Sequence, residues 1–105
     1  MPKSTDIPAS SRRAVAERDG SLCRSCGRWN DALHLHHIVY RSQERNHHDP
    51  GNLVSLCWRC HKVAHAHPRL MRPALQEVLT LPGTTALQWL RWQGQDLSVL
   101  ARGLL

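Results

Sequence analysis

The chain has 105 residues, and 41% of them are hydrophobic, which suits one domain with a small core. It carries 14 Lys and Arg against 8 Asp and Glu, a formal net charge of +6, and the whole excess falls between residues 12 and 72. Such a localised basic charge favours a polyanionic partner, above all nucleic acid. No segment approaches the ~20 apolar residues of a membrane span, and the first residues show no export signal. The composition therefore argues against a membrane protein and a secreted disulfide scaffold.

The N-terminal residues predict an arm followed by a short helix. Residues 1–11 are rich in proline and small polar side chains, so we expect a flexible arm there. Ser11 is a suitable N-cap for a helix over residues 12–19, which Gly20 would end. Three arginines would give this helix a basic face along a nucleic-acid backbone: Arg12, Arg13 and Arg18.

The middle of the chain predicts two strands and a helix. Residues 33–40 begin with alternating apolar and polar side chains and then a β-branched pair, which is typical of a strand. Residues 41–51 form a polar segment that ends in a turn signal, and residues 52–56 indicate a second short strand. Residues 57–66 suit a helix that Pro68 ends, because the residue before proline avoids the helical region.

Residues 68–105 differ in composition, since they contain no further cysteine or histidine and are rich in leucine. Pro73 is placed to start an amphipathic helix, and the Leu-Pro-Gly sequence at residues 81–83 would break it. Helical spacing of apolar residues predicts two more helices, over residues 85–93 and 96–102. We expect this extension to pack on the preceding domain or to form an interface.

The four cysteines form two C-x2-C pairs separated by thirty residues. Two such pairs can place four thiolates around one tetrahedral zinc ion, and a hairpin often fills a long gap between them. Disulfides suit a secreted chain, and a redox CxxC would not explain two pairs, so we predict a closed structural zinc site. Its ligands would be Cys23, Cys26, Cys57 and Cys60.

The eight histidines all lie between residues 34 and 67 and follow a second pattern, H-H-x14-N-x8-H-x3-H. The pattern starts at His36 and His37 and continues through Asn52. His61 and His65 are four residues apart on the predicted helix, so they share one face and can clasp one metal ion. The first strand can supply a third nitrogen, from His36. We therefore expect a second metal site, separate from the cysteines.

These segments, CRSCG, LHLHHIV and NLVSLCWRCHKVAH, resemble the HNH endonucleases with their ββα-metal fold. The resemblance spans about residues 23–67. It joins the His-His pair, the Asn-Leu-Val start of the second strand and the CxxCH sequence that opens the helix. The zinc-knuckle members of the family are the most similar, and the histidine spacing is similar to that of the colicin-type nucleases.

The resemblance implies a role for each histidine of the pattern. His37 matches the general base, and His36, His61 and His65 match the ligands of a catalytic divalent ion. Asn52 matches the residue that orients the loop and the base through hydrogen bonds. His36 stands where the family often has Asp, so Mn²⁺ or Ni²⁺ would be favoured over Mg²⁺, and Zn²⁺ is a further candidate. Because His36 and His37 point to opposite faces of a regular strand, we expect the strand to end or distort there.

Several other side chains are assigned no role in catalysis or metal binding. We take His34, His47, His48 and His67 as surface or core residues, with His34 close enough to support the site. Trp58 is interpreted as a packing residue rather than a base-stacking one. Four cations near the predicted site are expected to contact phosphates without reading sequence: Arg41, Arg45, Arg59 and Lys62.

The prediction is a small α+β protein of the ββα-metal type, with a four-cysteine zinc and flanking helices. Residues 12–67 would form the nuclease core, between the arm at 1–11 and the extension at 68–105. The expected function is hydrolysis of phosphodiesters in double-stranded DNA by one metal ion and a histidine base, giving a nick with 5′-phosphate and 3′-hydroxyl ends. We expect a cytoplasmic monomer or weak homodimer, encoded by a bacterium or phage. The alternatives are a zinc ribbon that binds nucleic acid without cutting it and a partner-binding subunit with a vestigial site.

Overall fold

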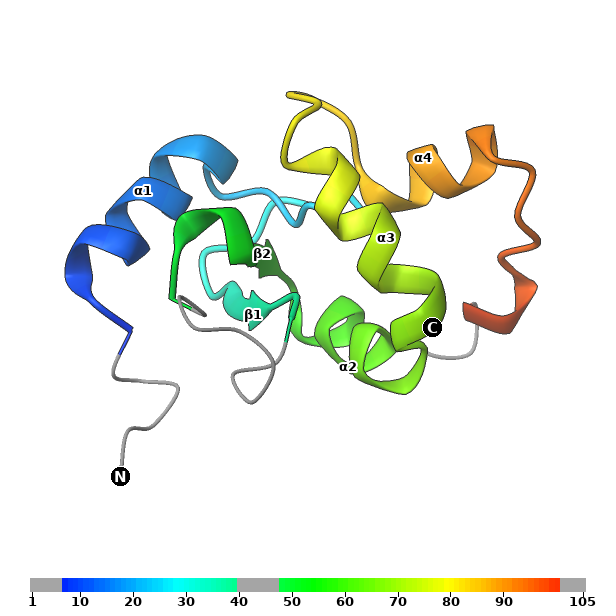
Figure 1. Cartoon of the computed structure of the whole chain (residues 1–105), viewed down its shortest axis with the longest axis horizontal. Helices are drawn as coiled ribbons and strands as arrows, with labels where there is room; N and C mark the ends of the chain where they lie inside the picture. The colour runs from blue at the N-terminus through cyan, green and yellow to red at the C-terminus, as the bar shows by residue number, and fades with distance from the viewer. Residues whose placement is uncertain (1–6, 40–47, 101–105) are drawn as a thin grey trace.

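The computed structural model describes residues 7–39 and 48–100, and Figure 1 shows how its elements are arranged. A two-stranded sheet of β1 and β2 lies between α1 on one side and α2 and α3 on the other. α4 packs beside α3. In chain order the elements are α1 (Ala9–Asp19), β1 (His34–His37), the 3-10 turn η3 (Pro50–Asn52), β2 (Leu53–Leu56), α2 (Trp58–Ala66), α3 (Pro68–Val78) and α4 (Ala86–Trp92).

β1 and β2 pair in antiparallel register, with His36 opposite Val54 and His37 opposite Leu53. All four residues of β2 are buried, because both faces of the strand are covered. Leu53 joins a small cluster with Val15 of α1, whereas Val54 and Leu56 join the main core. β1 is shorter than predicted. It ends at His37, in agreement with the expectation that the strand ends or distorts at the His36–His37 pair.

The main core brings the C-terminal helices onto the same apolar cluster as the sheet and the cysteine pairs. The amphipathic stripe of α3 is fully buried in this cluster, and α4 adds two side chains. The buried residues of the two helices are Met71, Ala74, Leu75, Val78, Ala86 and Leu90. Residues 68–100 therefore pack directly on the sheet and α2 and share their core.

The start of α1 differs from the prediction. The helix begins at Ala9, with Pro8 before it, and Ser11 is a buried residue inside the helix rather than its cap. Ile7 is also buried, in the cluster of Val15 and Leu53. This apolar contact holds the last residues of the predicted arm against the protein, and burial thereby extends the helix. Residues 1–6 lie outside the described residues.

Proline positions explain the second difference. Pro68 does not merely end α2, because it is also the first residue of α3, where its missing N–H costs nothing. Pro73, predicted to start a helix, lies inside α3. The buried stripe of α3 outweighs the backbone hydrogen bond that Pro73 cannot donate.

α4 has the capping box between Thr85 and Gln88 that favours a helix start at this position. Of the last predicted helix, residues 98–100 are helical, residues 96 and 97 are not, and residues 101–102 lie outside the described residues.

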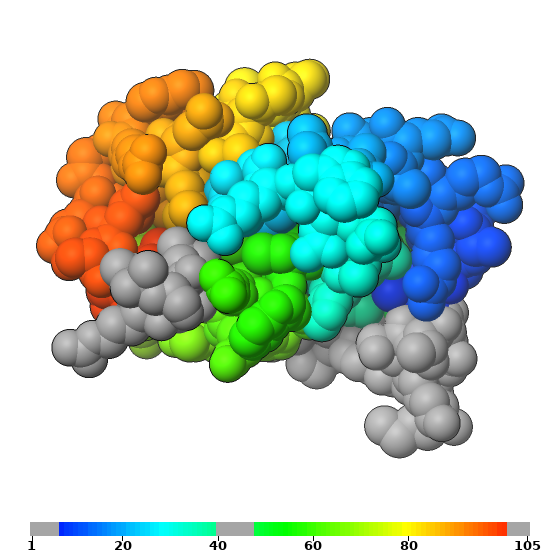
Figure 2. Space-filling view, turned by 180° about the vertical axis from the view of Figure 1, so that it is seen from behind, coloured from blue at the N-terminus to red at the C-terminus, as the bar shows by residue number. Residues whose placement is uncertain are grey.

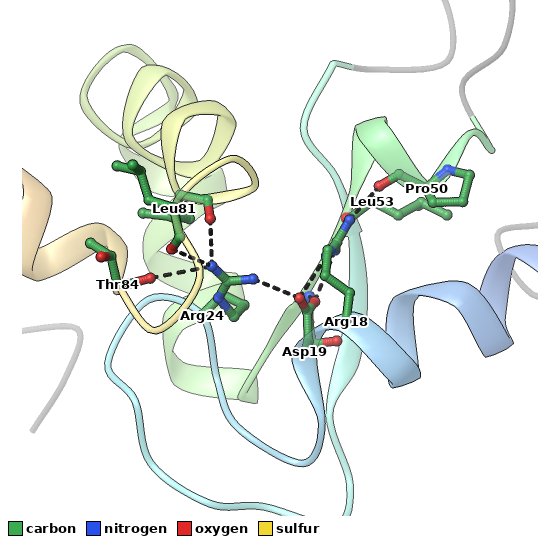
Figure 3. A network of polar contacts seen from close by, with 9 residues as sticks. Arg18, Asp19, Arg24, Pro50, Leu53, Leu81 and Thr84 are labelled. Atoms are coloured by element: carbon green, nitrogen blue, oxygen red, sulfur yellow. Dashed lines mark hydrogen bonds and ion pairs between the residues drawn. The ribbon is translucent and has the colours of Figure 1, made fainter.

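A buried ionic network ties four parts of the fold together (Figure 3). Asp19, at the end of α1, accepts hydrogen bonds from the guanidinium groups of Arg18 and Arg24 and from the backbone N–H of Ser55 in β2. Burial raises the pKa of Asp19, but the two arginines outweigh it, so that the pKa is lowered below its usual value. Arg24 also donates to the backbone oxygens of Val78, the last residue of α3, and of Leu81 and Thr84 in the segment that follows. The network therefore fixes the cysteine segment against both α1 and α3.

Arg18 was expected on a face that contacts nucleic acid, but its guanidinium points inward. It pairs with Asp19 and donates to the backbone oxygens of Pro50 and Leu53 at 2.7 and 2.6 Å. Arg18 thus positions η3 and the start of β2, while Arg12 and Arg13 are exposed. Within the part of the chain that the structure describes, no helix is long and apolar enough to cross a membrane.

Candidate metal centres and nucleic-acid interface

The two cysteine pairs converge on one point. The Sγ atoms of the four predicted ligands all lie within 4.8 Å of one another, and those of Cys26 and Cys57 are 4.0 Å apart. Four thiolates ~2.3 Å from a zinc ion lie just under 4 Å from one another, so the cluster fits a tetrahedral ion. All four cysteines are free of disulfides. The cluster therefore holds the donor set of a closed metal site, for which zinc is the suitable ion.

The first cysteine pair lies in a tight backbone turn. Cys23 N donates to the Arg28 oxygen at 2.9 Å, and Gly27 N donates to the Cys23 oxygen at 2.8 Å. Gly27 has a φ of +83°, a left-handed value that favours glycine. A hydrogen bond between the Cys23 and Cys60 thiols lowers the pKa of Cys23 to about 4 and raises that of Cys60. This turn, together with the start of α2, presents the four sulfur atoms to one ion.

The histidine pattern forms a second cluster at the junction of β1 and α2. One ring nitrogen from each of His36, His61 and His65 lies within 4.8 Å of the others. His36 is buried on the β1 face that packs toward α2, and its ring centroid lies 5.1 Å from those of both other histidines. The Nε2 atoms of His61 and His65 are 3.1 Å apart, as expected for residues one helical turn apart. Three imidazoles in this arrangement fit a borderline divalent metal ion.

Burial and neighbouring charges favour the neutral form of two histidines in this cluster. Burial, and then the charges of His61 and His65, lower the pKa of His36 to about 3. Burial also lowers the pKa of His61 to about 4, with further contributions from His65 and His34. Both rings are therefore neutral at neutral pH, and a neutral imidazole has the lone pair that a metal ion needs.

His34, interpreted from the sequence as a surface residue near the site, contacts His61 directly. Its Nδ1 atom lies 3.0 Å from Nδ1 of His61, while Nε2 of His61 faces His65. His61 can ligate a metal through Nε2 only when its hydrogen is on Nδ1, and that hydrogen then points at His34. His34 is thus placed to fix both the orientation and the tautomer of His61.

His37 is the last residue of β1 and lies on the opposite face from His36. Its Nε2 atom is 3.2 Å from Nδ1 of His48, a loop histidine that the sequence pattern did not assign to the site. Asn52 pairs with the backbone just after His37: its Oδ1 accepts from Val39 N at 2.8 Å, and its Nδ2 donates to the Val39 oxygen at 2.9 Å. This amide closes the turn that follows the predicted base.

Two of the predicted phosphate contacts lie on the exposed side of α2. The Arg59 guanidinium carbon and Lys62 Nζ lie 5.8 and 5.1 Å from the ring centroid of Trp58. Trp58 was interpreted as a packing residue beside the cysteines, but it is 52% exposed at the first position of α2. Arg41 and Arg45, the other two predicted contacts, and His47 lie outside the described residues.

The geometry therefore defines a small α+β protein with a ββα unit, a four-cysteine cluster and a three-histidine cluster. Residues 22–67 match the protein-family model described as HNH endonuclease. The match indicates similarity to HNH domains over this stretch, and such a domain suggests a nuclease-type or nucleic-acid-binding function with a nucleic-acid substrate. Searches of curated proteins and of solved structures each gave no match.

Proposed function

We propose that this protein is a metal-dependent HNH endonuclease that nicks double-stranded DNA. The observation that carries the proposal is the convergence of His36, His61 and His65, next in the chain to His37, at a site separate from the four cysteines. A zinc-binding module that only holds nucleic acid needs the cysteines and the basic charge. It has no use for three imidazoles at one point. We assign residues 12–67 as the nuclease core, acting in the cytoplasm as a monomer or weak homodimer.

The proposed metal ligands are His36, His61 and His65, with Mn²⁺ or Mg²⁺ as the working ion and zinc on the cysteines. A divalent cation bound by these nitrogens supplies Lewis-acid stabilisation of the negative charge that grows on the phosphate and the leaving oxygen. The ligands themselves contribute fixed positions, because His36 is buried on the strand and His61 is held by His34.

His37 has the role of general base. A neutral imidazole removes a proton from water near neutral pH, and the resulting hydroxide attacks the phosphorus atom in line with the 3′ oxygen. The P–O3′ bond breaks with its electron pair on O3′, and O3′ takes a proton from solvent water, which leaves a 5′-phosphate and a 3′-hydroxyl. Asn52 holds the turn at Val39 and so positions the end of β1 on which His37 lies. Arg59 and Lys62 then hold the DNA through its phosphates, without reading its sequence.

Plasmid relaxation tests this proposal. Supercoiled plasmid is incubated with zinc-loaded protein and Mg²⁺, Mn²⁺ or no added metal, and wild type is compared with His37→Ala at equal zinc content. We expect open-circle product that requires the added metal and falls at least about 100-fold in the variant, because general-base catalysis contributes 10²–10⁴-fold. Gel shifts of the same plasmid should be equal for both proteins.

Two results would contradict the proposal. Equal nicking by wild type and His37→Ala would remove the assigned base. A folded, zinc-loaded wild type that shifts DNA yet cuts none with either metal would support the non-catalytic zinc-ribbon alternative.

A further inference from the structure

Two tryptophans at the protein surface line one cavity. Trp29 is 68% exposed and Trp58 is 52% exposed. They come from segments far apart in the sequence, yet both line a cavity of about 210 Å³. Its walls are Arg28, Trp29, Asn30, Cys57, Trp58 and Arg59. A single exposed apolar residue is ordinary, but two large rings that share a cavity outside the core form a surface suited to a flat ligand.

Both tryptophans are held by the elements that carry the cysteines. Trp29 forms a β-bridge with Leu22, and next to it Asn30 N donates to the Ser21 oxygen at 2.8 Å. Trp58 is the first residue of α2 and follows Cys57. In Figure 2 the cysteine turn (cyan) and the start of α2 (green) meet on one face of the molecule. The cavity walls are therefore preorganised, which reduces the entropy lost on binding.

The charge around the cavity is positive. Arg28 and Arg59 line it, and Arg59 and Lys62 lie within 5.8 Å of the Trp58 ring centroid. Among the described residues, those that line the cavity include no acidic side chain. Exposed aromatic rings with cations beside them are the combination that binds unpaired bases, since the rings stack on bases and the cations pair with phosphates.

The cavity is close to the histidine cluster. Trp58 and His61 are three residues apart on α2, so they are neighbours on the helix surface. We propose that the cavity between Trp29 and Trp58 binds an unpaired nucleobase of the DNA strand whose phosphate lies at the histidine site. The proposal deepens the nuclease function above and rests on it for the substrate. The favoured substrate is then DNA with an unpaired base beside the cut, as at a gap, flap or frayed end.

Binding measured without catalysis tests this inference separately from cleavage. Zinc-loaded His37→Ala protein, with no other divalent metal, is titrated into a fluorescein-labelled 12-nucleotide single strand of adenines. A second ligand has the same length and charge but abasic sugars in its middle. We expect the His37→Ala protein, which keeps both tryptophans, to bind the adenine strand at least about tenfold more tightly than the abasic strand. This factor is the usual contribution of one stacked base.

Trp58→Ala and Trp29→Ala in the same background should weaken binding of the adenine strand by about tenfold and leave the abasic strand unchanged. Trp58→Phe should retain most of the affinity. The matched control is Trp92→Ala, because Trp92 is 67% exposed on α4 and does not line the cavity. Zinc content and thermal unfolding confirm that each variant is folded.

The inference is overturned if both strands bind equally to the wild-type cavity, or if the tryptophan variants weaken both strands alike, since charge alone would then explain binding. It is also overturned if polyglutamate displaces the adenine strand as well as unlabelled strand does, which would indicate an acidic protein partner. Loss of plasmid nicking, by contrast, would overturn the nuclease proposal and leave this binding result standing.

Discussion

At the scale of single residues, His61 is the side chain on which the proposed metal centre depends. Its Nε2 faces His65, and its Nδ1 faces His34 at 3.0 Å. The spacing of the histidines predicts that His61 and His65 share a helix face, because helical periodicity is a local property. It does not predict the contact with His34, because that depends on how β1 packs against α2.

His34→Ala should weaken the binding of Mn²⁺ or Ni²⁺ to the histidine site by about 10–100-fold, the usual effect of losing a partner that orients a metal ligand. His34→Gln should restore part of the affinity, because its amide oxygen can accept the Nδ1 hydrogen of His61. Calorimetric titration of the zinc-loaded proteins measures both, with His67→Ala as the control outside the cluster. An unchanged affinity in His34→Ala would show that His34 does not position His61.

Asn52→Ala should lower the free energy of unfolding by about 2 kcal/mol, because it leaves both backbone groups of Val39 without their partner. The nicking rate of the folded variant should also fall, since the turn after His37 is no longer held. This fall should exceed what the smaller folded fraction alone would cause. Denaturant unfolding and single-turnover nicking at a temperature where both proteins are folded separate the two effects. If the variant is less stable but nicks at the wild-type rate, Asn52 is a structural residue only.

At the scale of elements, local patterns predicted most of the helices and both strands, but tertiary contacts set their ends. α1 begins before its expected cap because Ile7 packs on Val15 and Leu53. Arg18 turns inward because the carbonyls of η3 and β2 need donors. For Arg18 the sequence shows only a charged helix face, and the folded structure shows that this charge is used inside the protein.

Pro73→Ala should stabilise the protein, because Pro73 lies in the interior of α3 and is exposed. Alanine supplies the N–H that an interior helical position normally donates. We expect a gain of about 1–3 kcal/mol in the free energy of unfolding, measured by urea denaturation. Pro68→Ala is the matched control and should change little, since the first helical residue has no intrahelical donor to lose. Equal effects of the two substitutions would contradict this explanation.

Asp19→Asn should lower the free energy of unfolding by about 3 kcal/mol, because it leaves the buried Arg24 without its counter-charge. The exposed Asp31→Asn serves as the control and should have little effect. Thermal and chemical unfolding report the difference, which should be accompanied by weaker zinc retention because Arg24 lies in the cysteine turn. Wild-type stability in Asp19→Asn would show that the hydrogen bonds, rather than the charge, hold the network.

At the scale of the whole molecule, two side-chain clusters that could each hold a metal ion lie in separate parts of one small domain. The cysteine cluster joins the turn at Cys23 to the start of α2, and the histidine cluster joins β1 to the next turn of that helix. The Cys and His spacings predict both groupings, since each depends on short-range motifs. No spacing of residues in the sequence predicts the cavity between Trp29 and Trp58, because it forms only when the two cysteine pairs come together in the fold.

Removal of the structural metal should unfold the protein. Cys60→Ser should lose the bound zinc and the cooperative thermal transition, because the free energy of binding a structural metal is part of the free energy of folding. Metal analysis and circular dichroism measure the two effects. A Cys60→Ser protein that keeps one zinc and a wild-type transition would contradict a structural role for the cysteines.

The rate of plasmid nicking as a function of Mn²⁺ concentration, in wild type and in His61→Ala with one zinc per chain, tests the central claim most directly. The account predicts saturable nicking by the wild type, and a folded variant that keeps its zinc and nicks at least about 100-fold more slowly. A His61→Ala protein that nicks at the wild-type rate, or one that loses its zinc, would contradict the separation of a catalytic histidine site from a structural cysteine site.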